Sequence, residues 1–136
     1  MRTVIVEDHE IVAAQLKQSI EELGHPVVGM ASSFSAAVDM LMREPPAELA
    51  FIDLVLGDDA GDTSGVLLVD LATRRSMQVV VTTALTPIPD HLQGVALLTK
   101  PFSSEQIGSV VASIARPMDA PSRQPEPRDM LCRARA

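Results

Sequence analysis

The chain has 136 residues and a formal net charge of −7, and a chain of this length can bury the core of one domain without disulfides or structural metals. Its only aromatic residues are three phenylalanines, which together with the negative charge argues against binding nucleic acid through base stacking or phosphate contacts. The single cysteine, Cys132, can form no internal disulfide, and neither a signal peptide nor an apolar run of ~20 residues is present, so we expect a cytoplasmic protein.

The first half of the chain alternates between strand and helix patterns. Residues 2–6 form a short apolar run that is typical of a buried strand, and residues 9–23 follow with helical spacing. The apolar face of that helix is expected to carry Val12, Leu16, Ile20 and Leu23, with Gly24 as the stop signal. A second strand is expected at 26–30, and Ser33 caps a helix that the Pro45–Pro46 pair ends.

The second half continues the alternation with one interruption. A strand at 49–53 precedes a polar loop at 57–65, a helix at 65–75 and a strand at 77–82. Two prolines then leave room for only a turn near residues 90–93, where a further helix would be expected. A fifth strand at 95–98 is followed by a helix that begins with a Ser103–Gln106 capping box and ends at Pro117.

This alternation predicts an α/β fold with a doubly wound, five-stranded parallel sheet, in which a β-α unit recurs five times and the fourth helix is short or vestigial. Residues 1–116 are expected to form this domain. Residues 117–136 are rich in proline and arginine with almost no apolar periodicity, so we expect a disordered tail there.

Chemically active side chains follow four of the five expected strands. Glu7 and Asp8 follow the first strand, and Asp53 ends the third. Thr83 follows the fourth strand and Lys100 the fifth. Because the carboxyl ends of parallel strands meet at one edge of the sheet, these groups are expected to share a crevice. Three carboxylates repel one another unless a divalent cation lies among them, and Mg²⁺ prefers such oxygen ligands. Metal, carboxylate, hydroxyl and ammonium together indicate a phosphoryl-transfer site.

Some of these residues also have purely structural interpretations. Glu7 and Asp8 are equally compatible with the N-cap and first turn of the helix that follows them. A threonine at a strand end is common, whereas Asp53 would be costly to bury without a partner. The loop acids at 58, 59 and 62 are interpreted as solvated, and the three histidines have no spacing typical of a metal site.

In chain order, the groups Glu7-Asp8, Asp53, Thr83-Ala84 and Lys100-Pro101-Phe102 resemble the receiver domain of two-component response regulators, over residues 2 to about 116. The resemblance implies that Asp53 accepts a phosphoryl group. It also implies a Mg²⁺ site at Asp53, with Asp8 as a direct ligand and Glu7 as a support that often acts through water. The backbone carbonyl of Val55 would complete the protein ligands.

The same resemblance implies roles for residues at the ends of the last two strands. Thr83, rather than Thr82, matches the hydroxyl that moves to bind the phosphoryl group, because Ala84 follows it. Lys100 matches the cation that pairs with the phosphoryl oxygens, and its bond to Pro101 is implied to be cis. Leu97 stands where the family usually has Tyr or Phe, and the segment before it looks like that of stand-alone bacterial receivers without a regular fourth helix.

The resemblance therefore implies a single-domain response regulator that a histidine kinase or phosphotransfer protein phosphorylates on Asp53 in a Mg²⁺-dependent step. Such a protein is not an enzyme in the usual sense, because it catalyses only its own phosphorylation and dephosphorylation. It would signal through contacts with a downstream protein, without nucleic acid or membrane. Two alternatives stay open: a degenerate receiver that binds partners without phosphorylation, and a Mg²⁺-dependent nuclease or topoisomerase-type module, which normally needs an Asp-x-Asp pair and a basic surface.

Overall fold

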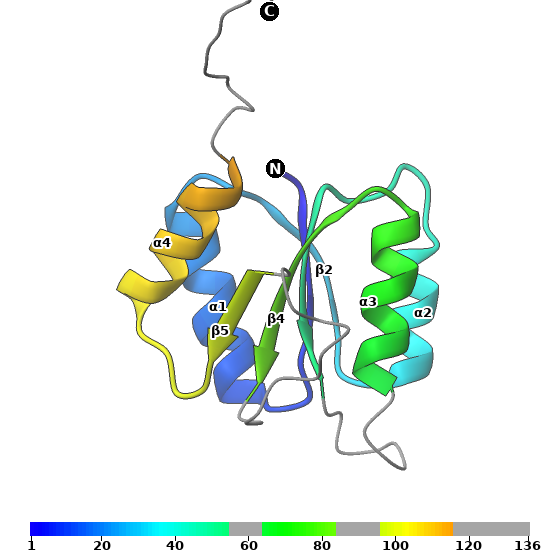
Figure 1. Ribbon diagram of the computed structural model, residues 1–136, viewed down its shortest axis with the longest axis horizontal. Coiled ribbons are helices and arrows are strands. Elements are labelled where there is room, and N and C mark those ends of the chain that lie inside the picture. Colours follow the sequence, from blue (N-terminus) through cyan, green and yellow to red (C-terminus); the bar gives the residue numbers. More distant parts are fainter. Residues whose placement is uncertain (55–63, 84–95, 116–136) are drawn as a thin grey trace, which may run out of the picture.

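A five-stranded parallel sheet with helices on both faces forms the centre of the computed structural model, which describes residues 1–54, 64–83 and 96–115 (Figure 1). The strands are β1 (Thr3–Val6), β2 (Val27–Ala31), β3 (Leu49–Asp53), β4 (Gln78–Thr83) and β5 (Ala96–Thr99). The helices are α1 (Glu10–Glu22), α2 (Phe34–Leu41), α3 (Ser64–Arg74) and α4 (Ser104–Ala115). The strand order β2-β1-β3-β4-β5 confirms the predicted doubly wound α/β fold.

The helices form two layers, with α1 and α4 on one face of the sheet and α2 and α3 on the other (Figure 1). The core on the α1–α4 face includes Ile5, Leu16, Ile20, Phe51, Val80, Leu98 and Ile107. The core on the α2–α3 face includes Val6, Leu41, Ile52, Leu68, Ala72 and Val81. Successive residues of a strand point to opposite faces, so these two sets show which face each strand position occupies.

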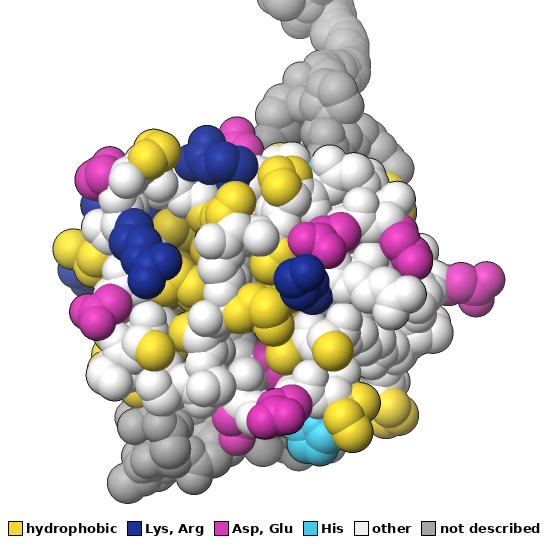
Figure 2. Space-filling model, turned by 180° about the vertical axis from the view of Figure 1, so that it is seen from behind, with side chains coloured by type: hydrophobic (Ala, Val, Ile, Leu, Met, Phe, Trp, Pro, Cys, Tyr) yellow, Lys and Arg dark blue, Asp and Glu magenta, His cyan; other side chains and the backbone are white. Residues whose placement is uncertain are grey.

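The central and edge strands differ in burial as their places in the sheet require. Every residue of β1 and β3 is buried, because neighbouring strands and helices cover them on all sides. The edge strand β2 leaves Val28 51% and Met30 44% exposed. Seen from behind, hydrophobic side chains lie across the middle of the surface, with charged side chains around them (Figure 2).

The two caps expected from the sequence are present. At the start of α2, the Ser33 hydroxyl accepts a hydrogen bond from the Ala36 amide at 3.3 Å. At the start of α4, the Ser103 hydroxyl accepts from the Gln106 amide at 3.1 Å, while the Gln106 side chain accepts from the Ser103 amide at 2.7 Å. This reciprocal pair confirms the predicted capping box.

Two expected helix details are wrong. Leu23 is 45% exposed instead of buried, because α1 ends at Glu22 and Leu23 lies at its C-cap, beyond the buried face. Helix α2 ends at Leu41, before the two prolines. The Arg43 amide donates to the Met40 carbonyl, three residues earlier, at 3.3 Å. This tighter turn ends the helix before the chain reaches Pro45.

Gly65 fits the start of α3 closely against the end of β3. Its amide donates to the Leu54 carbonyl at 3.2 Å, and a Cβ atom at this position would lie 2.3 Å from the Leu54 Cα. Only glycine can approach a backbone so closely. This contact fixes the chain immediately after Asp53.

Several sequence-based expectations lie outside the described residues: the turn near 90–93, the Val55 carbonyl, Ala84, the loop acids at 58, 59 and 62, and the tail at 117–136. In the part of the chain that the structure describes, no helix has the length and apolarity needed to cross a bilayer.

Candidate functional site

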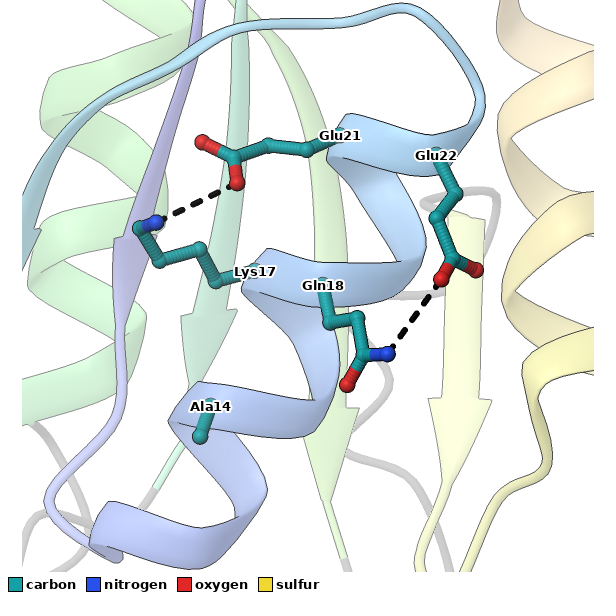
Figure 3. Close-up of a pocket in the computed structure, with 5 residues that line it drawn as sticks. All are labelled: Ala14, Lys17, Gln18, Glu21 and Glu22. Atoms are coloured by element: carbon teal, nitrogen blue, oxygen red, sulfur yellow. Dashed lines mark hydrogen bonds and ion pairs between the residues drawn. The ribbon is translucent and has the colours of Figure 1, made fainter.

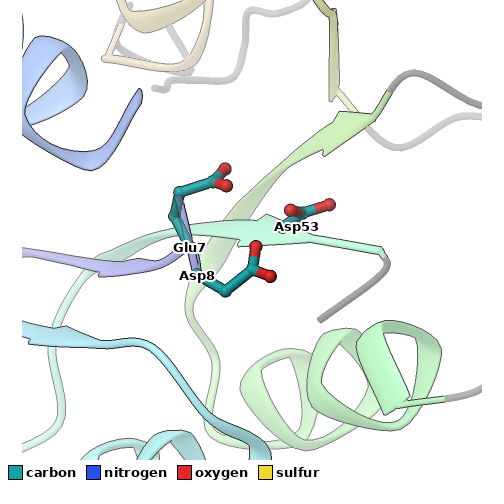
Figure 4. Close-up of side chains that lie close together, drawn as sticks. All are labelled: Glu7, Asp8 and Asp53. Carbon is teal, nitrogen blue, oxygen red and sulfur yellow. The ribbon is translucent and has the colours of Figure 1, made fainter. Parts of the chain in front are cut away.

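Three carboxylates lie together at the carboxyl edge of the sheet. Glu7 follows β1, Asp8 is the next residue, and Asp53 ends β3, the neighbour of β1 (Figure 4). One carboxylate oxygen from each lies within 4.8 Å of the other two. Glu7 and Asp53 are buried, with 3% and 4% of their surface exposed, whereas Asp8 is exposed. The cluster therefore has a buried base and an open side.

The structural interpretation of Glu7 and Asp8 as helix-capping residues is wrong. The N-cap of α1 is His9, and its side chain makes no capping hydrogen bond. The Glu7 side chain accepts a hydrogen bond from the His9 amide at 3.2 Å, but it lies in the crevice, where it also meets Lys100. The backbone therefore holds Glu7 toward the cluster.

Lys100 brings the only described ammonium group into this cluster. Its Nζ donates to Asp53 Oδ2 at 3.0 Å and to Glu7 Oε2 at 3.1 Å, and it lies 3.0 Å from Glu7 Oε1. The Lys100 amide also donates to the Thr83 carbonyl at 2.8 Å, which ties the end of β5 to the end of β4. The cation and the acids thus come from opposite halves of the chain but share one ion-pair network.

The segment after Lys100 is anchored on α1. The bond from Lys100 to Pro101 is cis, as the resemblance implied. The Gln15 side-chain amide donates to the Phe102 carbonyl at 3.0 Å, and the Phe102 ring is buried in the core of the α1–α4 face. A hydrogen bond of 3.3 Å between the hydroxyls of Ser19 and Ser104 joins α1 to α4. These contacts hold Lys100 in place from the helical side.

The electrostatics of the cluster show a shortage of positive charge. Burial, followed by the proximity of Asp53, raises the pKa of Glu7 to about 7, although Lys100 and the His9 amide favour the ionised form. Burial alone would lower the pKa of Lys100, but its hydrogen bonds to Asp53 and Glu7 outweigh burial and raise it. One ammonium is therefore too little charge for three neighbouring carboxylates.

The carboxylates suit a hard divalent cation. Within the described residues, Glu7 Oε1 is buried and makes no hydrogen bond, although the ammonium of Lys100 lies 3.0 Å away. A carboxylate oxygen that makes no hydrogen bond and lies beside two further carboxylates is the kind of ligand that Mg²⁺ prefers. The acidic cluster Glu7, Asp8 and Asp53 is thus consistent with a Mg²⁺ site.

Two threonines end β4 beside the cluster, on opposite faces of the sheet. Thr82 and Thr83 are 0% and 1% exposed. Thr82 pairs with Asp53 across the β3–β4 ladder, whereas Thr83 pairs with Thr99 of β5. Thr83 is the residue that the resemblance assigns to the site, and its carbonyl accepts from the Lys100 amide. Because Thr82 is the cross-strand partner of Asp53, the Thr82 side chain lies on the same face of the sheet as that of Asp53. In the sequence, the only indication that Thr82 could lie at the site was its position next to Thr83.

Two shallow hollows elsewhere on the described surface contain no buried cluster of carboxylates. One of about 500 Å³ lies over α1, where Lys17 pairs with Glu21 at 3.2 Å and Gln18 donates to Glu22 at 3.2 Å (Figure 3). These are exposed neighbours on one helix. The other, of about 340 Å³, lies between β5 and α4 and is lined by Leu97, Thr99, Gln106 and Val110 among others.

Comparison with known proteins agrees with this geometry. Residues 3–112 match the family described as the response regulator receiver domain. No curated protein matches the chain in sequence.

Several solved structures are similar to this chain. The receiver domain of the PhyR response regulator from Erythrobacter litoralis is 27% identical, with a TM-score of 0.69 over 82% of this chain and 87% of that one. PhyR from Brucella abortus is 28% identical with a TM-score of 0.68, and the match covers 82% of this chain but 46% of that one. SdrG from Sphingomonas melonis Fr1 has a TM-score of 0.71 over 84% and 95% of the two chains, and its identity of 20% shows the shared fold alone.

Proposed function

Because the chain belongs to the response regulator receiver domain family, we propose that Asp53 accepts a phosphoryl group from a histidine kinase or a phosphotransfer protein. The observation that carries this proposal is the contact of 3.0 Å between Lys100 Nζ and Asp53 Oδ2, beside two further carboxylates. A buried acid at a strand end, with a cation already on one oxygen, is suited to receive a group that carries several negative charges.

The chemistry proposed for the site is in-line phosphoryl transfer. A carboxylate oxygen of Asp53 forms a bond to phosphorus as the bond from phosphorus to the donor histidine breaks, and the electron pair of that bond goes to the imidazole nitrogen. Lys100 lies close enough to pair with the oxygens of the transferred group. Thr83, at the end of β4, is proposed to supply a hydroxyl to the same group.

A cation held by Asp8 and Asp53, with Glu7 in support, would neutralise charge on the phosphoryl oxygens during transfer. The carbonyl of Val55 is proposed as a further ligand. In this scheme the protein residues do the positioning: Lys100 bonds to both Asp53 and Glu7 on the buried side, while the exposed Asp8 leaves the other side open to the donor.

Output is proposed to take place through protein contacts, so that the chain acts as a single-domain response regulator or as a phosphate relay. The hollow between β5 and α4 lies two strands from Asp53 and is lined by both apolar and polar side chains, including Leu97 and Gln106. Leu97, Leu98 and Thr99 of β5 line this hollow and directly precede Lys100. A movement of Lys100 toward the phosphoryl group would therefore change the shape of this surface.

Mass spectrometry after incubation with acetyl phosphate tests the proposal. We expect one added phosphoryl group on the wild type with Mg²⁺, much less without it, and none in Asp53→Ala. Asp39→Ala, which removes an exposed acid of α2, is the control and should be labelled like the wild type. Labelling of Asp53→Ala at full stoichiometry would refute the assignment of Asp53. An unlabelled wild type that still binds its partner kinase would instead favour a degenerate receiver that acts as a binding module.

A further inference from the structure

Thr82 has a buried hydroxyl that the proposed function does not use. The residue is 0% exposed, and among the described residues Thr82 Oγ1 has no hydrogen-bond partner. A buried polar group without a partner lowers stability, and valine has nearly the same shape without this cost. A threonine at this position therefore points to a partner that only another state of the protein supplies.

Strand register places this hydroxyl beside the side chain of Lys100. Thr82 pairs with Asp53 of β3 on one side and with Leu98 of β5 on the other. Leu98 belongs to the core on the α1–α4 face, so its cross-strand neighbours face that side too. Lys100 follows β5, and its Nζ lies 3.0 Å from Asp53 Oδ2, two strands away. To reach that oxygen, the methylene groups of Lys100 cross β4 at the level of Thr82.

At rest, the ammonium of Lys100 is drawn past β4 toward β1. Its Nζ donates to Asp53 Oδ2 and also to Glu7 Oε2 at 3.1 Å, and Glu7 follows β1, one strand beyond Asp53. This position accounts for the unpartnered hydroxyl of Thr82, which lies on the other side of Asp53. The resting bond to Glu7 therefore competes with any bond to Thr82.

The loaded site weakens this hold on Lys100. Glu7 is proposed to support a divalent cation, whose two positive charges compete with the single charge of Lys100 for the same carboxylate. The oxygens of a phosphoryl group on Asp53 then attract the ammonium away from Glu7. An ammonium has three N–H donors, so Lys100 can bond to the phosphoryl group and to a neutral acceptor at the same time. Thr82 Oγ1 is a buried acceptor on the side of Asp53 from which Lys100 comes.

We propose that Thr82 is a positioning residue for Lys100: its hydroxyl, unpartnered at rest, accepts a hydrogen bond from Nζ once Lys100 has left Glu7 for the phosphoryl group. This inference rests on the proposed function and adds to it an acceptor that holds the ammonium on the β4 side of Asp53. The hydroxyl stabilises the loaded site and makes the resting protein less stable than valine would.

A double-mutant cycle tests this exchange without metal. Glu7→Leu removes the resting acceptor, so Lys100 should bond to Thr82 in that variant even at rest. By circular dichroism, Thr82→Val alone should melt at or above the wild-type temperature, whereas adding Thr82→Val to Glu7→Leu should lower the melting temperature.

Thr3→Val is the matched control for the cycle. Thr3 is also 0% exposed in a strand, and its hydroxyl donates to the Met1 carbonyl at 2.9 Å. Thr3→Val should lower the melting temperature by the same amount with Glu7 and with leucine at position 7, because its hydroxyl does not contact Lys100.

The lysine signals in nuclear magnetic resonance report on the bond itself, because Lys17 and Lys100 are the only lysines of the chain. In protein labelled with ¹⁵N at lysine Nζ, the Lys100 signals of Thr82→Val and the wild type should match at rest. They should separate when Mg²⁺ and beryllofluoride, a mimic of the phosphoryl group, are added. Lys17, which pairs with Glu21 on the exposed side of α1, should give the same signal throughout.

The affinity for beryllofluoride with Mg²⁺ gives a third readout. Titration calorimetry should show binding to Thr82→Val weakened by about threefold to tenfold, the range expected for one lost hydrogen bond. Thr82→Ser keeps the hydroxyl and should restore both the affinity and the Lys100 signal of the wild type.

Matching Lys100 signals of Thr82→Val and the wild type in the presence of beryllofluoride would overturn the proposal. So would an equal effect of Thr82→Val on melting with Glu7 and with leucine at position 7. If Glu7→Leu does not fold, the Lys100 signal decides alone. If the wild type neither binds beryllofluoride nor becomes phosphorylated, the proposed function itself fails, and that result is separate because it appears without any substitution.

Discussion

At the scale of single residues, the site depends on the balance between one ammonium and the acids around it. Lys100 bonds to both Glu7 and Asp53, and their side chains are 0% and 6% exposed. Removing one member of such a buried group leaves the others without compensation, which costs more than the group contributes when it is intact. Lys100 thus has a structural role in the resting protein as well as its proposed role toward the phosphoryl group.

Lys100→Met keeps the length of the side chain and removes its charge. Without metal at pH 8, we expect it to lower the free energy of unfolding by about 2–3 kcal/mol, measured by urea unfolding with circular dichroism, since the chain has no tryptophan. Lys17→Met is the matched control: Lys17 and its partner Glu21 are 46% and 42% exposed, so its effect should stay below about 0.5 kcal/mol. Equal losses in the two variants would contradict the buried network.

The raised pKa of Glu7 predicts how stability depends on pH. Burial and Asp53 raise this pKa from 4.5 to about 7, so between these values the folded state binds a proton that the unfolded state has released. The free energy of unfolding of the metal-free protein should therefore fall as the pH rises from about 4.5 to about 7, by up to about 3 kcal/mol. Urea unfolding at a series of pH values measures this slope.

Glu7→Gln is the control for the pH dependence, because it keeps the shape of the side chain and cannot ionise. Its stability should be flatter over the same pH range and higher than that of the wild type at pH 8. A wild-type protein that becomes more stable from pH 5 to pH 7 would show that another group dominates.

At the scale of elements, contacts from helices α1 and α3 hold the strand ends that carry Asp53 and Lys100. Gly65 at the start of α3 donates to the carbonyl of Leu54, the residue after Asp53, and Gln15 of α1 donates to the Phe102 carbonyl, two residues after Lys100. The ends of β3 and β5 are therefore each fixed by a helix, and the two helices belong to different layers. The positions of Asp53 and Lys100 depend on both layers being packed against the sheet.

Two glycine substitutions separate close packing from helix propensity. Gly65→Ala would place a Cβ atom 2.3 Å from the Leu54 backbone, so the end of β3 must shift. We expect a loss of about 2–3 kcal/mol in urea unfolding and a lower yield of phosphorylation at Asp53. Gly108→Ala meets nothing within 4 Å in α4 and should instead stabilise the protein by about 0.5–1 kcal/mol. A neutral Gly65→Ala would mean that this contact does not fix the site.

At the scale of the whole molecule, the sheet brings together residues from both ends of the sequence. The order β2-β1-β3-β4-β5 reverses direction after β1, so β1 and β3 are neighbours and their carboxyl ends open into a crevice between the helical layers. The acids of this crevice repel one another in the folded protein and lie apart in the unfolded one. A cation that binds only the folded crevice must therefore stabilise the whole domain.

Mg²⁺ should raise the melting temperature measured by circular dichroism. At a concentration tenfold above its dissociation constant, the expected stabilisation is about 1.4 kcal/mol. Asp8→Asn, which changes the exposed carboxylate of the cluster, should remove most of this effect, whereas Asp70→Asn on the exposed face of α3 should retain it. Identical melting of the wild type and Asp8→Asn at all Mg²⁺ concentrations would contradict a metal site at this cluster.

The sequence by itself determined the elements and the chemical character of the site. Apolar runs and helical spacing identified all five strands and the four described helices, because burial between two layers demands those periodicities. The acids after β1 and β3 and the lysine after β5 could be placed at one edge, because parallel strands put their carboxyl ends together.

Only the tertiary structure decided which atoms meet. It showed that Lys100 bonds to Glu7 as well as to Asp53, and that Glu7 faces the crevice instead of capping α1. It also showed that Thr82, and not Thr83, is the cross-strand partner of Asp53. Strand register and side-chain face follow from how the two helical layers pack on the sheet, and contacts between residues 47 or 93 positions apart leave no periodic signal in a sequence.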